Sequence, residues 1–343
     1  MKRKRPVSIH DVARRAGVSP GTVSRAMAGR AGIHVDTRQR VLDAVGELRY
    51  QPNRAAQRLS TGRHLAIAVI VPFFTTAPVS ARLNGAVKVL ADTPYDLIIH
   101  NVTTLEQRAA CFQEIPHRQQ ADGVLIISLS PRDACEVESL RRAEVPVVLI
   151  DADHPDVVAT PRVVIDDVGG GRAATEHLLR LGHRRIGFVG DVSDNAFYFI
   201  WSRDRLLGYR QALAAAGVPE RPEYRAEGEP SREGARALAE AMLRSHDRPT
   251  AIVAASDTQA VGVLEAAREL GLRVPEQLSV IGYDDIELAQ VVGLTTMRQP
   301  LEHSGRRGTE LLLGAMHGGT QAAPREVLLS ELVVRATTAA PPS

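Results

Sequence analysis

Apolar residues recur at helical spacing in three separate stretches within the first 50 residues. The i, i+3, i+4 repeat predicts short amphipathic helices over 9–16 and 20–27 and a longer third helix over 36–49. The apolar positions are Ile9, Val12, Ala13 and Ala16 in the first stretch, Val23, Ala26 and Met27 in the second, and Val41, Leu42, Val45 and Leu48 in the third. We expect the third helix to close a three-helix domain over the apolar faces of the other two.

The residues around the first two stretches are those that start and stop helices. Ser8 and Asp11 form a capping-box-like pair at the first helix, and Gly17 suits the left-handed residue that ends it. Ser19 is a good N-cap for the second helix, and Pro20 fits its first position. This arrangement predicts a helix-turn-helix whose second helix enters a DNA major groove; the alternative is an ordinary helical hairpin.

The distribution of charge favours the DNA-binding interpretation. Residues 1–63 hold 14 Lys and Arg against 4 Asp and Glu, a net charge of +10, although the whole chain carries only +2. Residues 64–343 therefore carry −8. A basic segment joined to an acidic body is typical of a nucleic-acid-binding domain attached to a domain with another role.

The stretch that joins the two parts has the composition of a helix of only about two turns. Pro52 ends the preceding helix, and residues 53–60 are too few to be stable alone in water. We expect this stretch to order when it binds a surface, with Leu59 as an apolar wedge in the DNA minor groove. A plain linker is the alternative.

From residue 64 onward the pattern changes to apolar, β-branched runs that alternate with amphipathic stretches. The first set predicts strands at 65–71, 96–100, 123–128 and 145–151, with helices at 79–91, 105–119 and 132–143. The second set predicts strands at 185–190, 251–255 and 278–282, with helices at 170–181, 203–216, 232–245 and 258–270. Two parallel, helix-covered sheets predict a two-lobed α/β body, which binds ligands beyond the carboxyl ends of its strands.

Polar residues at these strand ends are the candidates for a ligand site. Asp151, Ser256 and Asp284 each follow a predicted strand, and Arg205 begins a predicted helix. Carboxylates with a guanidinium offer the paired hydrogen bonds that hold vicinal hydroxyls. Asp257 could equally be a helix N-cap.

Aromatic residues make up 4% of the chain, yet four of them fall within residues 197–201. Aromatic rings stack on sugar faces and on purines, so Phe199 and Trp201 are candidates for the cleft, and Phe73 is a similar candidate on the other lobe. The alternative is that these rings pack in the core or at a dimer contact.

Motifs for catalysis, metal binding and membrane insertion are missing from the sequence. It contains no G-x-x-x-x-G-K, G-x-S-x-G or H-E-x-x-H, and Cys111 and Cys135 are far apart in sequence. We expect no enzyme activity, no cofactor and no metal, and we interpret residues 169–171, three glycines, as a flexible helix entry beside the cleft. No apolar core follows the basic residues 2–5, so we expect a cytoplasmic protein.

Several motifs together resemble the lactose/galactose repressor (LacI/GalR) family of bacterial transcription regulators. They are Ile9-His10-Asp11-Val12-Ala13, Val18-Ser19-x-x-Thr22-Val23-Ser24-Arg25, Thr37-Arg38, and Tyr50-x-Pro52-Asn53-Arg54-x-Ala56-x-x-Leu59. Segments 181–186, 280–285 and 294–301 resemble the family's body signatures. The resemblance implies a periplasmic-binding-protein-like body with crossovers between lobes, which we place near 165, 296 and 325.

The resemblance also implies domain boundaries and site residues. We expect a helix-turn-helix domain at 1–50, a hinge helix and linker at 51–63, a first lobe from 64–165 with 298–325, a second lobe from 166–297 with 326–337, and a disordered tail at 338–343. The expected DNA-binding residues are Ser19, Pro20, Gly21, Thr22, Ser24, Arg25, Asn53, Arg54, Ala56 and Leu59. The expected effector-binding residues are Phe73, Asp151, Phe199, Trp201, Arg205, Ser256 and Asp284.

These observations predict a DNA-binding repressor that is switched by a small molecule. We expect a dimer on a pseudo-palindromic operator, because the end of the chain lacks the leucine heptads that some relatives use to form tetramers. The Asp and Arg residues favour a sugar effector, while the aromatic residues leave a purine or a co-repressor open. A solute-binding protein or a sugar-acting enzyme on the same body is the alternative from a different class.

Overall fold

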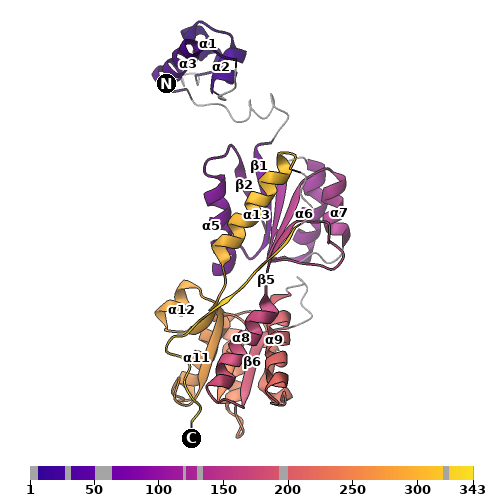
Figure 1. Ribbon diagram of the computed structural model, residues 1–343, viewed down its shortest axis with the longest axis vertical. Helices are drawn as coiled ribbons and strands as arrows, with labels where there is room; N and C mark the ends of the chain where they lie inside the picture. The colour runs from indigo at the N-terminus through magenta and orange to yellow at the C-terminus, as the bar shows by residue number, and fades with distance from the viewer. Residues whose placement is uncertain are drawn as a thin grey trace. The chain divides into compact units, whose positions relative to one another are not determined.

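The computed structural model describes residues 7–27, 32–50, 64–118, 121–129, 134–192, 200–319 and 324–342. The chain divides into two compact units, Met1–His64 and Leu65–Ser343 (Figure 1). We call the first unit the head and the second the body.

The head contains the three predicted helices: α1 (Ile9–Ala16), α2 (Pro20–Met27) and α3 (Val35–Leu48). The backbone N–H of Ser8 donates to Asp11 Oδ2 over 2.9 Å, and Gly17 ends α1 with a φ of 67°. Only glycine adopts this left-handed conformation at little cost, so the turn into α2 depends on Gly17.

A small apolar core holds the three helices of the head together. Val12, Val23 and Val41, one from each helix, are completely buried in it. Leu42 was expected in this core, but it is 46% exposed because Val41 and Ala44 occupy the inward positions of α3.

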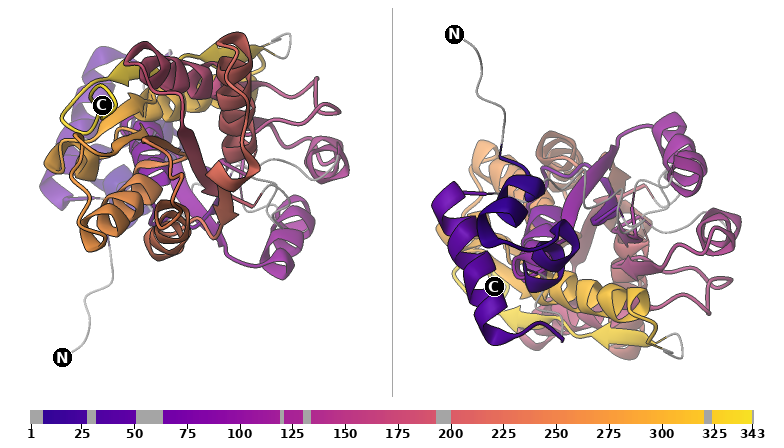
Figure 2. Two further views of the ribbon diagram at one scale, coloured as in Figure 1. Left: turned by 90° about the horizontal axis from the view of Figure 1, so that it is seen from below. Right: turned by 90° about the horizontal axis from the view of Figure 1, so that it is seen from above.

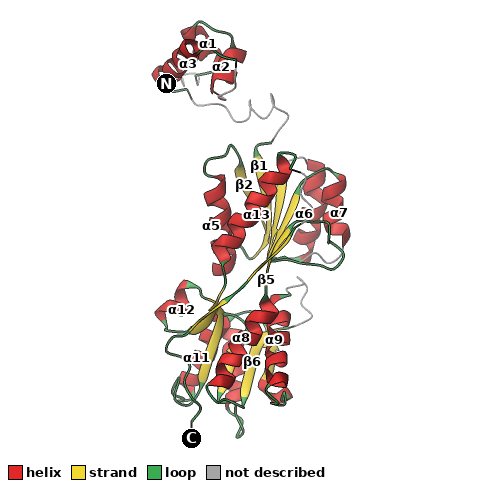
Figure 3. Ribbon diagram, in the orientation of Figure 1, coloured by secondary structure: helices red, strands yellow, loops and turns green. Residues whose placement is uncertain are grey.

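The body consists of two lobes, each built on a six-stranded sheet with helices on both faces (Figure 3). In lobe 1 the strand order is β11-β5-β4-β3-β1-β2, and all neighbouring strands are parallel. The strands are β1 (Ala66–Pro72), β2 (Asp96–Val102), β3 (Gly123–Ile127), β4 (Val147–Ile150), β5 (Arg162–Ile165) and β11 (Arg325–Leu328). Helices α5 (Ala77–Leu90) and α13 (Leu301–Met316) cover one face, and α6 (Leu105–Arg118) and α7 (Ala134–Arg142) cover the other.

In lobe 2 the strand order is β12-β10-β9-β8-β6-β7, and only the β10–β12 pair is antiparallel. The strands are β6 (Ile186–Asp191), β7 (Arg225–Gly228), β8 (Ala251–Ala254), β9 (Ser279–Asp284), β10 (Thr295–Arg298) and β12 (Glu331–Val333). Helices α8 (Asp167–Arg180) and α9 (Trp201–Ala215) lie on one face, and α10 (Arg232–Leu243) and α11 (Asp257–Glu269) lie on the other (Figure 2). The short helices η1 (Pro222–Tyr224) and α12 (Glu287–Val291) complete this lobe.

The chain crosses between the lobes three times, and two crossings differ from their expected positions. The first follows β5, close to the expected residue 165. The second was expected near 296, but this residue lies inside β10, so the chain crosses at 299–300. The third was expected near 325, but residues 325–328 form β11 and pair with β5 of lobe 1. The chain therefore crosses at 329–330.

The expectation of a disordered tail at 338–343 is wrong for the residues described, which extend to 342. Thr338 Oγ1 lies 3.0 Å from His177 Nε2, and the Ala339 carbonyl lies 2.8 Å from His183 Nε2. The Ala339 N–H also donates to Ser279 Oγ. These polar contacts fix the tail to lobe 2, which its Ala- and Pro-rich composition did not indicate.

The three consecutive glycines at the start of α8 permit close packing, and the expectation of a flexible helix entry is wrong. A Cβ on Gly170 would lie 1.9 Å from the Tyr283 hydroxyl, and one on Gly171 would lie 2.2 Å from the Arg205 carbonyl oxygen. Since neither position has room for a side chain, glycine allows α8 to approach both α9 and β9. No helix in the described residues is long and apolar enough to cross a membrane.

Candidate functional site: a DNA-reading helix and an interlobe pocket

Helix α2 presents a polar outer surface, as the apolar pattern predicts. Val23 and Ala26 are buried against the other head helices, while Ser24 and Arg25 are exposed. Ser19 caps the helix, because its Oγ accepts a hydrogen bond from the Thr22 N–H over 3.1 Å. This leaves the side chains of the outer face available for a partner outside the head.

The outer face of α2 fits the DNA-reading role expected for it. Gly21 has no side chain, and Pro20 offers only an apolar edge. Arg25 is therefore the long hydrogen-bonding side chain on this face; its Nε donates to the Gly21 carbonyl over 3.3 Å, within its own helix. The expected hinge residues Asn53, Arg54, Ala56 and Leu59 all lie outside the described residues.

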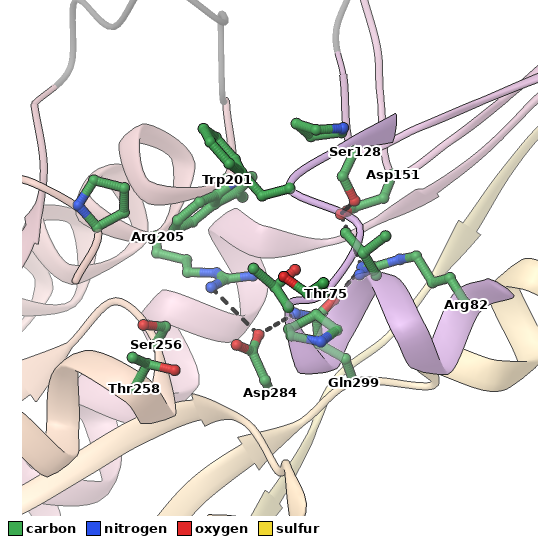
Figure 4. A pocket seen from close by; sticks show the side chains of 16 residues that line it. Thr75, Arg82, Ser128, Asp151, Trp201, Arg205, Ser256, Thr258, Asp284 and Gln299 are labelled. Carbon is green, nitrogen blue, oxygen red and sulfur yellow. Dashed lines mark hydrogen bonds and ion pairs between the residues drawn. The ribbon is translucent and has the colours of Figure 1, made fainter. Parts of the chain in front are cut away.

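A pocket of about 410 Å³ lies between the two lobes of the body (Figure 4). Its volume falls in the range typical of small-molecule sites. Residues at the carboxyl ends of strands from both sheets contribute to it, where parallel α/β sheets bind ligands. The lining residues are Pro72, Phe73, Thr75, Thr76, Pro78, Val79, Arg82, Ser128, Asp151, Trp201, Arg205, Pro230, Ser256, Thr258, Asp284 and Gln299.

The wall from lobe 1 is organised around an ion pair between Arg82 of α5 and Asp151 after β4. Arg82 Nη2 lies 2.8 Å from Asp151 Oδ2, and their side chains are only 1% and 8% exposed. Ser128, after β3, donates a hydrogen bond from its hydroxyl to the same oxygen over 2.8 Å. Because both side chains are buried, separating the two charges would cost a large amount of free energy. The ion pair therefore holds both side chains in place.

The wall from lobe 2 is organised around Arg205 of α9, which is 3% exposed. Its Nε donates to Asp167 Oδ1 over 2.8 Å, and its Nη1 donates to the Ala255 carbonyl and lies 3.6 Å from Asp284 Oδ1. The guanidinium also lies over two rings, 3.6 Å from the centroid of Tyr283 and 5.1 Å from that of Trp201. Partners on several sides hold the planar group in one orientation.

Gln299 connects the two walls, and it occupies the second crossing between the lobes. Its Oε1 accepts from Arg82 Nη2 over 3.0 Å, and its Nε2 donates to Asp284 Oδ1. A continuous buried chain of polar groups therefore runs from Asp151 through Arg82, Gln299 and Asp284 to Arg205 (Figure 4). A shift of the polar groups on one wall therefore acts on the other wall through these hydrogen bonds and ion pairs.

Burial is the largest influence on the acids of lobe 2. It raises the pKa of Asp284 to about 6, although Arg205 and Arg82 both act to lower that pKa. It also raises the pKa of Asp167 to about 7 against the opposing effect of Arg205. Near neutral pH these carboxyl groups are therefore close to their protonation equilibria, whereas exposed aspartates are fully ionised.

Several residues at this site have backbone angles that are unfavourable for side-chain-bearing residues. Phe73, Ser128, Asp151 and Asp284 all line the pocket, and all have positive φ, of 45°, 52°, 53° and 114°. Such strain persists only where surrounding structure enforces it, and it concentrates at functional sites. The strand ends of the body are thus shaped to direct these side chains into the pocket.

Six of the seven residues predicted for effector binding line the pocket: Phe73, Asp151, Trp201, Arg205, Ser256 and Asp284. The seventh, Phe199, lies outside the described residues. Ser256 is also the N-cap of α11, since its Oγ accepts from the Gln259 N–H over 3.2 Å.

Asp257 takes neither of the two roles considered for it. It is completely buried at the start of α11, where its carboxylate accepts from the Thr296 hydroxyl and the Ile286 N–H. It therefore holds β10 and the start of α12 in place, while Ser256 caps the helix.

The sequence interpretation missed Arg82, Ser128, Thr258 and Gln299 as pocket residues. Arg82 sits inside a helix, where an arginine usually lies on the solvated face. Ser128 ends a predicted strand just as Asp151 does, so the strand-end rule could have found it. Among the described residues no group of three or more His, Cys, Asp or Glu is arranged to hold a metal ion.

A three-helix head with a helix-turn-helix, attached to a two-lobed body with a small-molecule pocket, defines the class of ligand-responsive DNA-binding regulators. A family model described as "Bacterial regulatory proteins, lacI family" matches residues 8–53, and one described as "Periplasmic binding protein-like domain" matches residues 175–338.

Similar proteins match the chain over nearly its whole length. It is 32% identical to the HTH-type transcriptional regulator DegA of Bacillus subtilis, over 96% of this chain and 98% of that protein. It is 35% identical to the HTH-type transcriptional regulator CelR of Thermobifida fusca, over 98% and 99%. The chain therefore belongs to the LacI family of bacterial transcriptional regulators, and the prediction of a DNA-binding regulator is confirmed.

Solved structures agree with this assignment. The complex of the transcriptional regulator CelR with cellobiose matches with a TM-score of 0.73 and 31% identity, over 97% of this chain and all of that one. The lac repressor dimer bound to operator and the anti-inducer ONPF matches with a TM-score of 0.83 and 28% identity, over 98% and 100%. The predicted fold class, a helix-turn-helix head on a periplasmic-binding-protein-like body, is also confirmed.

Proposed function

We propose that the protein is a repressor that binds a pseudo-palindromic operator as a homodimer in the cytoplasm, and that a sugar in the interlobe pocket switches it. The observation that carries the proposal is the chain of polar groups from Asp151 to Arg205, because a ligand in the pocket would contact both lobes. Relatives with named ligands support a sugar: the matching CelR structure contains cellobiose, and another LacI-family structure contains ribose.

The switching mechanism follows from the position of the pocket. A ligand whose hydroxyls pair with Asp151 on lobe 1 and with Asp284 on lobe 2 would favour one angle between the lobes. Only a ligand with different affinities for two lobe angles can shift their equilibrium. In a dimer this angle would set the separation of the two heads, with a coupling of about 1–3 kcal/mol.

DNA recognition is assigned to the outer face of α2 and to the hinge. Ser19, Pro20, Gly21, Thr22 and Ser24 would position the helix against the groove and the phosphates, and Arg25 would pair with a guanine. From the sequence we assign phosphate contacts to Arg54 and a minor-groove wedge to Leu59, with Asn53 and Ala56 beside them.

One experiment tests DNA binding and switching together. The full chain selects binding sites from random double-stranded DNA, and the selected sequence is expected to be a two-fold repeat, because a dimer presents two α2 helices. Fluorescence anisotropy then measures the affinity for that site with and without a panel of sugars, purines and sugar phosphates. At least one uncharged sugar should change the affinity.

A variant of the pocket and a matched control locate the effect. Asp151→Asn should weaken the response to the sugar while leaving DNA binding without sugar near normal. Asp92→Asn, at an exposed position of the same lobe, should change neither property. A response to a purine and to no sugar would favour the purine regulator, with Trp201 as its stacking partner. Equal responses of the two variants would place the effector elsewhere.

A further inference from the structure

The charges that line the pocket are already paired with one another. Among the described residues, Arg82 and Arg205 are its cationic side chains, and Asp151 and Asp284 are its anionic ones. Arg82 is 2.8 Å from Asp151, and Arg205 is 3.6 Å from Asp284. Each guanidinium that a negatively charged ligand could use therefore has a carboxylate beside it.

A further carboxylate, that of Asp167, lies behind the lobe 2 wall and adds to the negative charge around the guanidiniums. Asp167 accepts from Arg205 Nε over 2.8 Å, so three acids surround two guanidiniums. Fully ionised, these five groups carry a net charge of −1. When Asp167 holds a proton, two carboxylates still face two guanidiniums, and the net charge is zero. Neither of these states, in which Asp284 stays ionised, offers a surplus positive charge, and they prevail above the Asp284 pKa of about 6.

The remaining polar groups of the pocket are uncharged. They include the hydroxyls of Thr75, Ser128 and Thr258 and the amide of Gln299, alongside the apolar surfaces of Phe73 and Trp201. Carboxylates accept hydroxyl hydrogen bonds, and aromatic surfaces pack on C–H groups. Both features suit a neutral molecule rich in hydroxyls.

We infer that this pocket selects uncharged polyhydroxy ligands and rejects their phosphorylated and carboxylated relatives, because its two guanidiniums are committed to Asp151, Asp284 and Asp167. The inference rests on the proposed role of the pocket as the effector site and narrows the class of effector. Placing a phosphate beside these acids would bring like charges together in a buried site, which costs about two powers of ten in affinity or more.

Trp201 gives a direct readout, since it lines the pocket and is the only tryptophan of the chain. The full chain is titrated at pH 8 with uncharged hexoses and disaccharides, with the 6-phosphate and uronic acid of each hexose, and with inorganic phosphate alone. We expect a fluorescence change with an uncharged sugar, about a hundredfold or more weaker binding of its charged forms, and no response to phosphate. A charged form that binds as tightly as its parent, or a response to phosphate, would overturn the inference.

Two charge-neutralising variants test the cause. Asp151→Asn frees Arg82 from its carboxylate, whereas Asp284→Asn leaves Arg205 paired with Asp167. Each variant removes one negative charge from the pocket, so each should gain about tenfold in affinity for inorganic phosphate or a hexose phosphate. Two variants supply independent tests should one of them fail to fold, as judged by circular dichroism. The control Asp92→Asn, at an exposed site, should gain nothing.

The outcomes separate this inference from the proposed function. If no sugar changes Trp201 fluorescence or DNA binding, the proposed effector site is wrong, while a phosphate gain in either variant still supports the charge pairing. If a sugar binds but neither folded variant gains affinity for phosphate, the proposed function stands and the charge argument is wrong.

Discussion

Replacing Gln299 by alanine removes a side chain that joins the two pocket walls. Gln299 is 5% exposed, accepts a hydrogen bond from Arg82 over 3.0 Å and donates another to Asp284. Hydrogen bonds to charged groups contribute about 1.5–3 kcal/mol each, so the two together set an upper bound of about 6 kcal/mol. In this variant Arg82 still forms its ion pair with Asp151, and Asp284 still lies beside Arg205. Water from the pocket can also occupy the vacated space. We therefore expect Gln299→Ala to lower the free energy of unfolding of the body by about 2 kcal/mol.

Urea unfolding of the full chain, followed by Trp201 fluorescence, measures this change because the tryptophan reports on the body alone. Gln290→Ala is the matched control, since Gln290 is exposed on α12 and the same atoms are removed there. A double-mutant cycle with Arg82→Ala should give a coupling energy of about 0.5–3 kcal/mol, as expected for residues in direct contact. Equal costs at Gln299 and Gln290, or strictly additive effects of Arg82 and Gln299, would refute the continuous polar chain.

Three more predictions concern the head, the packing and the pH response. Arg25→Ala should weaken specific DNA binding by about 1–3 kcal/mol in anisotropy titrations, and an equal loss on scrambled DNA would reassign Arg25 to phosphate. Gly305→Ala should destabilise the body by about 1–3 kcal/mol in urea, because its Cβ would lie 1.9 Å from the Arg82 carbonyl oxygen. Gly46→Ala, in open space on α3 of the head, is the control and should leave the urea unfolding of the body, followed by Trp201 fluorescence, unchanged. Burial raises the pKa of Asp257 from 3.8 to about 8, so the folded body holds a proton that the unfolded chain releases, and its stability falls as pH rises from about 4 to about 8, by at most about 1.4 kcal/mol per pH unit. Asp257→Asn should flatten this decline between about pH 5 and 8, and parallel declines in both proteins would contradict the assignment.

The sequence predicted most reliably those elements whose determinants are local. Ser19, Pro20 and Gly17 define the helix-turn-helix through their own backbone preferences, and the structure places all three as expected. The buried strands of both lobes were equally visible because each is a run of apolar residues, such as β1 and β3.

The elements that the sequence did not reveal depend on their neighbours. Strands β5, β7 and β12 have only three or four residues, and charged side chains such as Arg162 and Glu227 interrupt their patterns. They become strands because a neighbouring strand in the sheet offers free backbone groups. The same is true of Arg82 and Gln299. They are buried against each other although they lie 217 positions apart in the sequence, so no local pattern indicates their contact.

Neither lobe is a continuous piece of chain, and this has a consequence for the protein as it leaves the ribosome. Lobe 1 takes Leu311 and Leu312 of its core from α13 and an outer strand from β11, both of which are made after residue 300. At synthesis rates of 5–20 residues per second, the strands made first wait roughly ten to fifty seconds for these parts. Most of lobe 2 is synthesised within that interval, while part of the apolar surface beneath α13 stays uncovered. Both lobes are therefore completed only when the last part of the chain is made, and lobe 1, whose first strands wait longest, is the one that most needs protection from aggregation in the nascent chain.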